Sequence, residues 1–200
     1  MPGDRLPFAP FMLFSLADDG TITQGGALSV AVGRFGAGGL TSLGGTIKRR
    51  PDDKPMLVLV SSLEEAQRLG VWNVRARALA ETVWPGPLTL LVKADAARLP
   101  WLAGATGKIG VRVSGHPYCR ALTSVSGRAL LSTSANRSGE AYDGDPVRLR
   151  ALFTDEVDLF INAGLLPPSP PSTVVDASGE IPVLVREGAL PVSALAGHIA

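Results

Sequence analysis

From Ile47 onward, apolar runs of strand length alternate with helix start signals, and this alternation limits the fold more than any other feature of the chain. The run Met56–Val60 is continuous and apolar, which is typical of a strand in a sheet covered on both faces. Ser62 and Glu65 have the spacing of a capping box, so we expect a helix from there to Gly70, where glycine can end it. The pattern therefore predicts a buried strand followed at once by a helix.

The same alternation continues to the C-terminus. Asn73 is expected to cap a helix that ends at Val83, and Asp145 to cap one that begins at Pro146. Further helices are expected over 116–125, 146–153 and 191–197, and further strands over Leu88–Val92, Ile109–Val113, Ala129–Ser132, Val157–Ile161, Thr173–Val175 and Val183–Val185. These elements predict an α/β fold (α+β in some schemes), a single domain with a twisted mixed β-sheet flanked by helices.

Residues 1–46 differ from the rest of the chain in composition. They hold five charged residues and ten of the 23 glycines, and they have no helical or strand periodicity of useful length. We expect a flexible or poorly folded leader there. Over the whole chain, 19 basic and 18 acidic residues give a net charge of +1, so phosphate binding must come from a local cluster.

A cytoplasmic location without membrane association is expected. The single Cys119 has no partner for an internal disulfide, which favours a reducing compartment. The apolar stretch Leu6–Ala17 resembles a targeting signal, but Pro7 and Pro10 interrupt it. No apolar run reaches the length of a membrane span.

Histidine and cysteine are too few for a metal site or a common nucleophile. His116 and His198 are the only histidines, and neither has a second ligand at metal spacing, so no protein-held metal is expected. His116 precedes Pro117 at a predicted helix start, where a surface or capping role is the simpler interpretation. The sequence also has no G-x-S-x-G elbow.

Two polar segments remain as candidate sites. The loop 48–55 holds four cations within seven residues before the Met56–Val60 strand; they suit phosphate oxygens, although such a loop can also be a solubilising surface. The segment 132–139 brings hydroxyls and an amide to the end of the Ala129–Ser132 strand, where α/β sheets bind ligands. A plain Asx or Ser turn is the alternative there.

These two segments carry a family resemblance. Lys48-x-Arg50-Pro51 followed by Ser134-x-Asn136 resembles the signature of the YrdC-like threonylcarbamoyl-AMP synthases (L-threonylcarbamoyladenylate synthases). The resemblance covers about 150 residues, from Ile47 nearly to the C-terminus. Other agreeing stretches, in the family's order, are Lys54–Leu57, Trp84–Thr89, Gly110–Val113, Ser172–Asp176 and Val185–Gly188.

The resemblance implies an activity. Members of this family convert ATP, L-threonine and bicarbonate into threonylcarbamoyl-adenylate and pyrophosphate, which supplies the threonylcarbamoyladenosine modification of tRNA. The resemblance therefore implies a nucleotidyltransferase, with tRNA or double-stranded RNA and other tRNA-modification proteins as further partners. Mg²⁺ is expected to be held mainly by the ATP phosphates.

The resemblance also assigns roles to residues. Lys48 and Arg50 are implied as catalytic, and Arg112, Ser132 and Ser172 as threonine-binding. The ATP-binding set is Lys48, Arg50, Lys54, Ser134, Asn136 and Arg186. The cations suit the reaction because an anionic carbamate must attack an anionic α-phosphate, and the leaving pyrophosphate gains charge.

Residues 1–46 depart from the family's pattern. The family opens with a Thr-Val-Tyr-Gly-Leu turn that forms part of the pocket, and nothing in this segment matches it. We therefore divide the chain into 1–46, a divergent or mistranslated segment, and 47–200, the YrdC-like domain. Two alternatives to a synthase stay open: a non-catalytic module that binds nucleotide or double-stranded RNA, and an α/β remnant without activity.

Overall fold

The computed structural model describes residues 11–15, 29–33, 57–95, 106–126, 129–134, 145–153, 159–161 and 170–199. The helices in these segments are α2 (Leu63–Gln67), α3 (Val74–Val83), α5 (Pro117–Ser126), α6 (Pro146–Phe153) and the 3₁₀ helix η2 (Val192–Leu195). The strands are β1 (Phe11–Ser15), β2 (Ser29–Gly33), β3 (Leu57–Leu59), β4 (Gly70–Val71), β5 (Leu88–Ala94), β6 (Lys108–Arg112), β7 (Leu130–Ser134), β8 (Leu159–Ile161), β9 (Thr173–Asp176) and β10 (Val183–Arg186).

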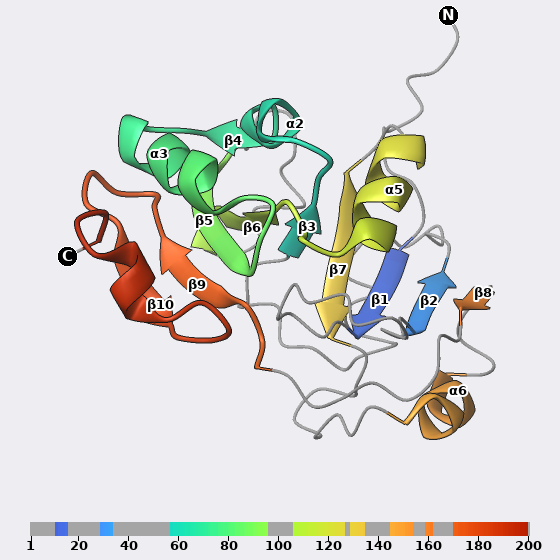
Figure 1. Cartoon of the computed structure of the whole chain (residues 1–200). Coiled ribbons are helices and arrows are strands. Elements are labelled where there is room, and N and C mark those ends of the chain that lie inside the picture. Colours follow the sequence, from blue (N-terminus) through green and yellow to red (C-terminus); the bar gives the residue numbers. More distant parts are fainter. Residues whose placement is uncertain are drawn as a thin grey trace, which may run out of the picture.

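All ten strands belong to one mixed sheet (Figure 1). Its order is β10-β9-β5-β6-β3-β7-β1-β2-β8, and β4 pairs with β5. The pairs β5–β9, β3–β6 and β1–β7 are parallel and the others are antiparallel. The predicted α/β class with a mixed sheet is confirmed.

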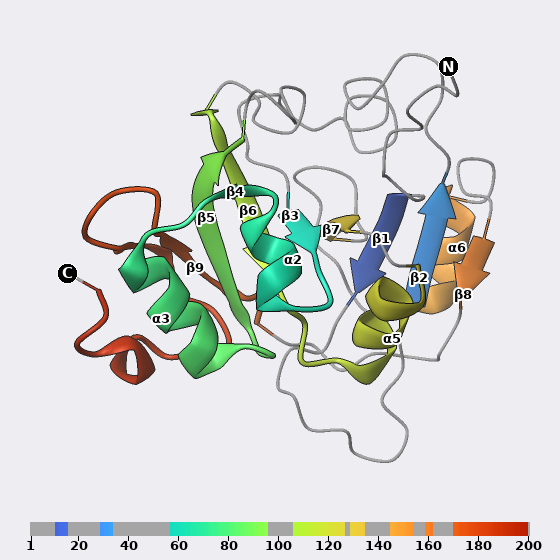
Figure 2. The ribbon, with the colours of Figure 1, turned by 90° about the horizontal axis from the view of Figure 1, so that it is seen from above.

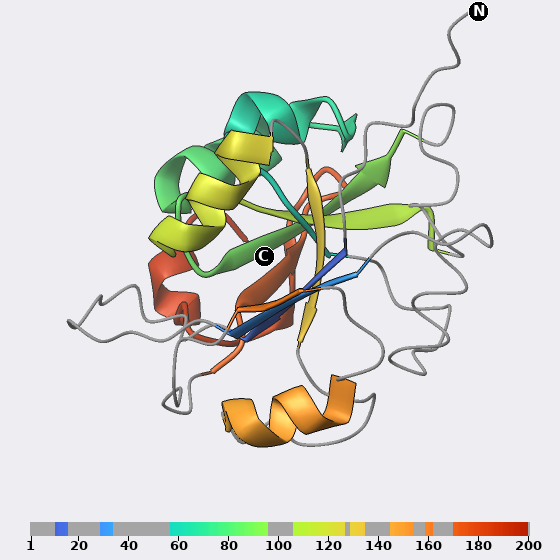
Figure 3. The same ribbon diagram turned by 90° about the vertical axis from the view of Figure 1, so that its right-hand side faces the viewer.

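The helices lie on both sides of this sheet. Helices α2, α3 and α5 lie on one side, as the view from above shows (Figure 2). Helix α6 lies on the other side, near β2 and β8 (Figure 3). No helix in the described part of the chain is long and apolar enough to cross a membrane.

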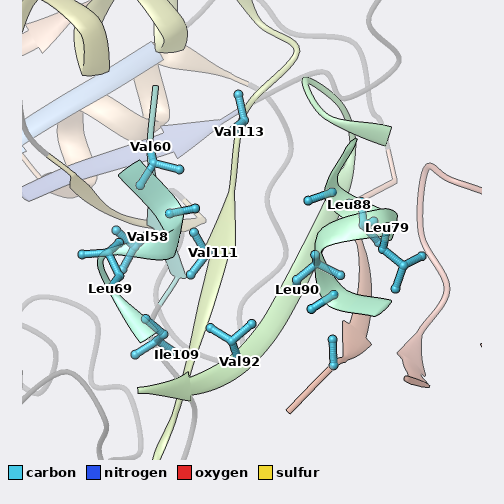
Figure 4. Packing of buried hydrophobic residues seen from close by; sticks show 14 of the residues in the cluster. Val58, Val60, Leu69, Leu79, Leu88, Leu90, Val92, Ile109, Val111 and Val113 are labelled. Carbon is cyan, nitrogen blue, oxygen red and sulfur yellow. The ribbon is translucent and has the colours of Figure 1, made fainter. Parts of the chain in front are cut away.

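The hydrophobic core lies between α2, α3 and the central strands. In β5, Leu88, Leu90 and Val92 are fully buried and alternate with residues of the opposite face, as a period of two requires (Figure 4). The same alternation occurs in β6, where Ile109 and Val111 join this core. The core face of each strand is therefore apolar, and the residues between belong to the other face.

The capping box begins α2, but the helix is shorter than expected. The amide of Glu65 donates to the Ser62 hydroxyl at 3.2 Å, while the Glu65 carboxylate accepts from the amide and hydroxyl of Ser61. The helix ends at Gln67 and not at Gly70, because Gly70 begins β4 and pairs with β5. A Cβ at Gly70 would lie 2.4 Å from the carbonyl oxygen of Lys93, so this close approach requires glycine.

Asn73 ties the start of α3 to the β9–β10 connection. Its Oδ1 accepts from the amide of Ala76 at 2.8 Å, which is the expected N-cap. Its Nδ2 donates to the carbonyl oxygens of Ala177 at 3.0 Å and Gly179 at 2.7 Å. The Asn73 side chain therefore caps the start of α3 and also holds the β9–β10 connection, which lies far along the sequence.

Two corrections concern the ends of the chain. The segment 1–46 was expected to lack strands, yet it contributes β1 and β2. Strand β1 pairs with β7 and β2 with β8, and pairing with such distant partners leaves no mark in local periodicity. The predicted helix over 191–197 is the shorter 3₁₀ turn η2, because Gly197 (φ +84°) reverses the chain soon after Leu195.

Candidate functional site

Buried polar residues gather on the sheet face opposite the core. In β6, Arg112 follows the core residue Val111, so it lies on the face opposite the core. It pairs with Leu59 of β3. In β5, Thr89 lies between the core residues Leu88 and Leu90 and therefore on the same face as Arg112. Ser132 of β7 pairs with Leu57 of β3, two residues from Leu59, so it lies on this face too. We call this surface the polar face; Thr89, Arg112 and Ser132 on it are each 4% exposed.

Arg112 is fixed by the turn that precedes β5. Its Nε donates to the carbonyl oxygen of Gly86 at 2.9 Å, and the Gly86 amide donates to the carbonyl oxygen of Val113 at 3.0 Å. A Cβ at Gly86 would lie 2.3 Å from the carbonyl oxygen of Val83, so the turn closes only with glycine. Arginine keeps its charge in proteins, so the polar face holds a buried cation of fixed orientation.

Ser172 joins the polar face from the other end of the sequence. It lies directly before β9, which runs parallel to β5 with Leu88 opposite Thr173. The hydroxyls of Ser172 and Thr89 are 2.9 Å apart, and the Thr173 amide donates to the carbonyl oxygen of Pro87 at 2.9 Å. Two predicted threonine-binding residues, Arg112 and Ser172, are therefore connected through the segment that begins β5.

Arg186 lies beside Ser172. Its Nη2 donates to the Ser172 carbonyl oxygen at 2.9 Å. The residue is exposed at the end of edge strand β10, where the pairing with β9 shifts between Leu184 and Arg186. The structure thus brings a predicted ATP-binding residue into contact with a predicted threonine-binding residue.

An ion pair lies further along the polar face. Lys108 Nζ and Asp176 Oδ2 are 2.5 Å apart, and both side chains are about one quarter to one third exposed. Burial raises the pKa of Asp176, but the hydrogen bonds from Lys108 and from Ser178 outweigh it and hold this pKa below its ordinary value. The carboxylate is therefore ionised and its charge is matched by Lys108.

The described residues contain four of the predicted site side chains: Arg112, Ser132, Ser172 and Arg186. Arg112 and Ser172 are linked as above, and Ser132 lies on β7, two strand spacings or about 10 Å across the sheet from β6. Ser134 ends β7 at the register position of Phe14, and its side chain lies outside the description. Lys48, Arg50, Lys54 and Asn136 also lie outside the described residues.

Metal ligands do not gather in this part of the protein. Among the described residues, no group of three or more His, Cys, Asp or Glu side chains could hold a metal ion. His116 has the capping role expected of it, because its Nδ1 accepts from the Tyr118 amide at 3.3 Å. On the polar face, the Arg112 guanidinium and the hydroxyls of Ser132 and Ser172 suit anionic and hydroxylated ligands.

Two hydroxyl residues of this region had received no predicted role. Thr89 contacts Ser172, and Thr173 accepts from the Gly188 amide at 2.9 Å. The available signal was a hydroxyl placed within an apolar strand sequence, as in Leu88-Thr89-Leu90. Such a residue on a covered sheet needs a hydrogen-bonding partner, and its presence predicts one.

Comparison with known proteins shows which family the chain resembles. The family model Sua5/YciO/YrdC, described as telomere recombination, matches residues 45–188. A threonylcarbamoyl-AMP synthase of Methylococcus capsulatus is 34% identical over 132 residues, which cover 66% of this chain and 71% of that protein. One of Marinobacter nauticus is 33% identical over 134 residues, covering 65% and 70%. Both relatives carry the name threonylcarbamoyl-AMP synthase.

Solved structures agree with this placement. Pyrococcus abyssi Sua5 in complex with L-threonine superposes with a TM-score of 0.73 at 26% identity; the match covers 88% of this chain and 52% of that one. This chain therefore spans about half the length of that protein. Escherichia coli YciO matches in fold, with a TM-score of 0.75 at 24% identity and coverage of 92% and 86%. The family resemblance expected from the motifs is confirmed.

Proposed function

The chain belongs to the Sua5/YciO/YrdC family, and from this membership we propose that it is an L-threonylcarbamoyladenylate synthase. L-threonine and bicarbonate condense to the carbamate with loss of water. A carbamate oxygen then attacks the α-phosphorus of ATP, the bond from this phosphorus to the β-bridging oxygen breaks, and pyrophosphate leaves. The products are threonylcarbamoyl-adenylate and pyrophosphate.

The observation that carries this proposal is the buried Arg112 beside the Thr89–Ser172 hydroxyl pair. Arg112 is held by Gly86, and it lies on the same sheet face as Ser132. A fixed guanidinium in a region of low exposure interacts more strongly with a carboxylate or carbamate than one in water does. The serine hydroxyls supply neutral donors for the remaining oxygens of L-threonine. The P. abyssi relative bound to L-threonine supports this choice of substrate.

We assign nucleotide binding to the region of Arg186, next to the Ser172 carbonyl oxygen. Arg186 would contact the ATP phosphates together with Lys48, Arg50, Lys54, Ser134 and Asn136, as the family motif implies. Lys48 and Arg50 would neutralise the charge that develops on pyrophosphate during the displacement. Mg²⁺ would arrive on the ATP phosphates as part of the substrate, where it shields the same charges.

The proposed product is an activated carbamoyl donor for adenosine in tRNA. The reaction therefore belongs with tRNA-modification proteins, which would receive the adenylate, and it would occur in the cytoplasm. The division of the chain into 1–46 and 47–200 belongs to the same proposal. In it, residues 47–200 carry every residue to which the family motif gives a role, Lys48 and Arg50 among them.

The test measures pyrophosphate release by the full chain with ATP, L-threonine and bicarbonate. We expect release that requires both co-substrates. Arg112→Lys keeps the charge but loses the planar fork, so kcat/KM for threonine should fall at least about tenfold. Arg75→Lys, an exposed arginine on α3, is the matched control and should leave it unchanged.

Other outcomes would contradict the proposal. ATP binding without turnover would indicate a nucleotide-binding module. Duplex RNA binding that weakens steeply with salt, again without turnover, would indicate an RNA-binding module. Equal activity of Arg112→Lys and wild type would remove Arg112 from the substrate site.

A further inference from the structure

The chain segment around Arg186 is fastened to the start of β9 by what we call the C-terminal clasp, residues 171–173 together with 186–190. Ser172 in the first half belongs to the polar face, and Arg186 in the second half contacts its carbonyl oxygen. The clasp contains four hydrogen bonds: Arg186 Nη2 to Ser172 O at 2.9 Å, Gly188 N to Thr173 Oγ1 at 2.9 Å, Ala189 N to Pro171 O at 2.8 Å, and Thr173 Oγ1 to Leu190 O at 2.6 Å.

The Thr173 hydroxyl lies at the centre of the clasp. It accepts from the Gly188 amide and donates to the Leu190 carbonyl oxygen, and Thr173 is fully buried. A hydroxyl has a single proton to donate, so this donor is fully used. Removing the oxygen would leave one backbone donor and one backbone acceptor without their partner in a half-buried segment.

Glycine at position 188 lets the two halves of the clasp approach each other closely. A Cβ there would lie 2.0 Å from the carbonyl oxygen of Pro171 and 2.7 Å from that of Ser172. The two halves of the clasp therefore pack backbone against backbone. The direction of each hydrogen bond fixes the position of residues 186–190. A small outward shift would break several of these bonds together.

The two halves of the clasp depend on the Thr173 hydroxyl to different degrees. Ser172 keeps its hydroxyl contact with Thr89, and the Thr173 amide keeps its bond to Pro87, when the Thr173 hydroxyl is lost. Arg186 is exposed at the end of edge strand β10, after the register shift, and two residues further on the Gly188 amide is held by the Thr173 hydroxyl. Loss of the hydroxyl should therefore free the arginine and leave the serine in place.

From this asymmetry we infer that Thr173 is a positioning residue: its hydroxyl holds the 186–190 segment so that Arg186 meets the nucleotide, without holding the threonine-binding side. This inference rests on the proposed function for its kinetic consequence. Thr173 acts through Arg186 and does not itself touch a substrate.

The test compares Thr173→Val, Thr173→Ser and the control Thr82→Val in the full chain. Thr82 is exposed on α3 and donates only to the carbonyl oxygen of Ala78, so its loss should change nothing. For Thr173→Val we expect the KM for ATP to rise about tenfold, which is the effect of losing one well-placed contact. The KM for threonine should stay within about twofold of the wild-type value. Thr173→Ser should restore the wild-type KM for ATP. Thr89→Val should give the reverse pattern, because it frees Ser172.

Amide hydrogen exchange gives a second measurement that does not depend on activity. In Thr173→Val, the amides of Gly188 and Ala189 should both exchange at least about tenfold faster if the hydroxyl holds the whole segment. Ala189 bonds to Pro171 and not to Thr173, so its continued protection would overturn the inference. If Thr173→Val does not fold, Thr173→Cys, whose thiol is a weak donor, takes its place.

The two proposals fail separately. A wild-type chain that releases no pyrophosphate refutes the synthase, and the exchange measurement still decides the role of Thr173. An active wild type in which Thr173→Val raises both KM values equally, or in which Thr173→Ser is as impaired as Thr173→Val, refutes the positioning role. Unchanged KM values in Thr173→Val refute it as well.

Discussion

Replacing Asn73 by alanine should destabilise the protein by more than the loss of a helix cap. The side chain accepts from the Ala76 amide and donates to the carbonyl oxygens of Ala177 and Gly179. An N-cap contributes about 1 kcal/mol, and each net hydrogen bond about 0.5–1.5 kcal/mol. The bond to Gly179 is exposed and belongs at the low end, so Asn73→Ala should lower the free energy of unfolding by about 2–3 kcal/mol.

Asn73→Asp separates the two contributions. Aspartate keeps an oxygen for the Ala76 amide and is as good a cap as asparagine, but it cannot donate to the carbonyl oxygens of Ala177 and Gly179. We expect Asn73→Asp to lose about 1–2 kcal/mol, mainly from these two carbonyls. Asn73→Ser, with a hydroxyl too short to replace the amide group in full, should lie between aspartate and alanine.

Urea unfolding followed by circular dichroism measures these differences at constant m-value. If Asn73→Asp were as stable as wild type, the tie between α3 and the β9–β10 connection would contribute nothing. If Asn73→Ala lost less than about 0.5 kcal/mol, the cap itself would be unimportant. Either result would refute the reasoning from the hydrogen bonds.

Two further predictions concern the clasp and the ion pair. Gly188→Ala should destabilise the protein by about 2 kcal/mol or more in the same assay, because its Cβ would overlap the carbonyl oxygen of Pro171. Gly179→Ala, whose Cβ meets nothing closer than 4.0 Å, is the control, and equal losses would contradict the close approach. The lowered pKa of Asp176 means that its carboxylate stabilises the fold above its ordinary pKa, and that this contribution is lost as pH falls through the folded-state value. Asp176→Asn should remove that part of the pH dependence between about pH 5 and 3, and an unchanged profile would rule out the Lys108 pair as its cause.

Elements with strong local signals could be predicted from the sequence. Helix α6 begins and ends where expected, since the Asp145 carboxylate accepts from the Val147 amide at 2.8 Å and Pro146 occupies the first helical position. Strand β4 was missed because two residues are too short for periodicity to appear. Its pairing with β5 depends on the close approach at Gly70, which only the folded chain reveals.

The candidate site, too, could be predicted only in part from the sequence. The motifs gave Arg112, Ser172 and Arg186 as candidates, and the structure connects the last two directly. The Thr89–Ser172 contact could not be predicted, because 83 residues separate these hydroxyls and the parallel pairing of β5 with β9 decides their distance. Local pattern therefore identifies the chemical groups, and the long-range register determines which of them meet.

The parallel pairing of β5 with β9 also has a consequence for synthesis on the ribosome. Strand β5 leaves the ribosome long before β9, so the stretch Leu88–Leu91, which pairs with β9, lacks this partner while more than half of the binding groups are still untranslated. Contacts so distant in sequence form late and slow the folding of a chain. The nascent protein should therefore need protection of the β5 edge until Ser172 emerges, and binding competence should arise only in the final stage of translation.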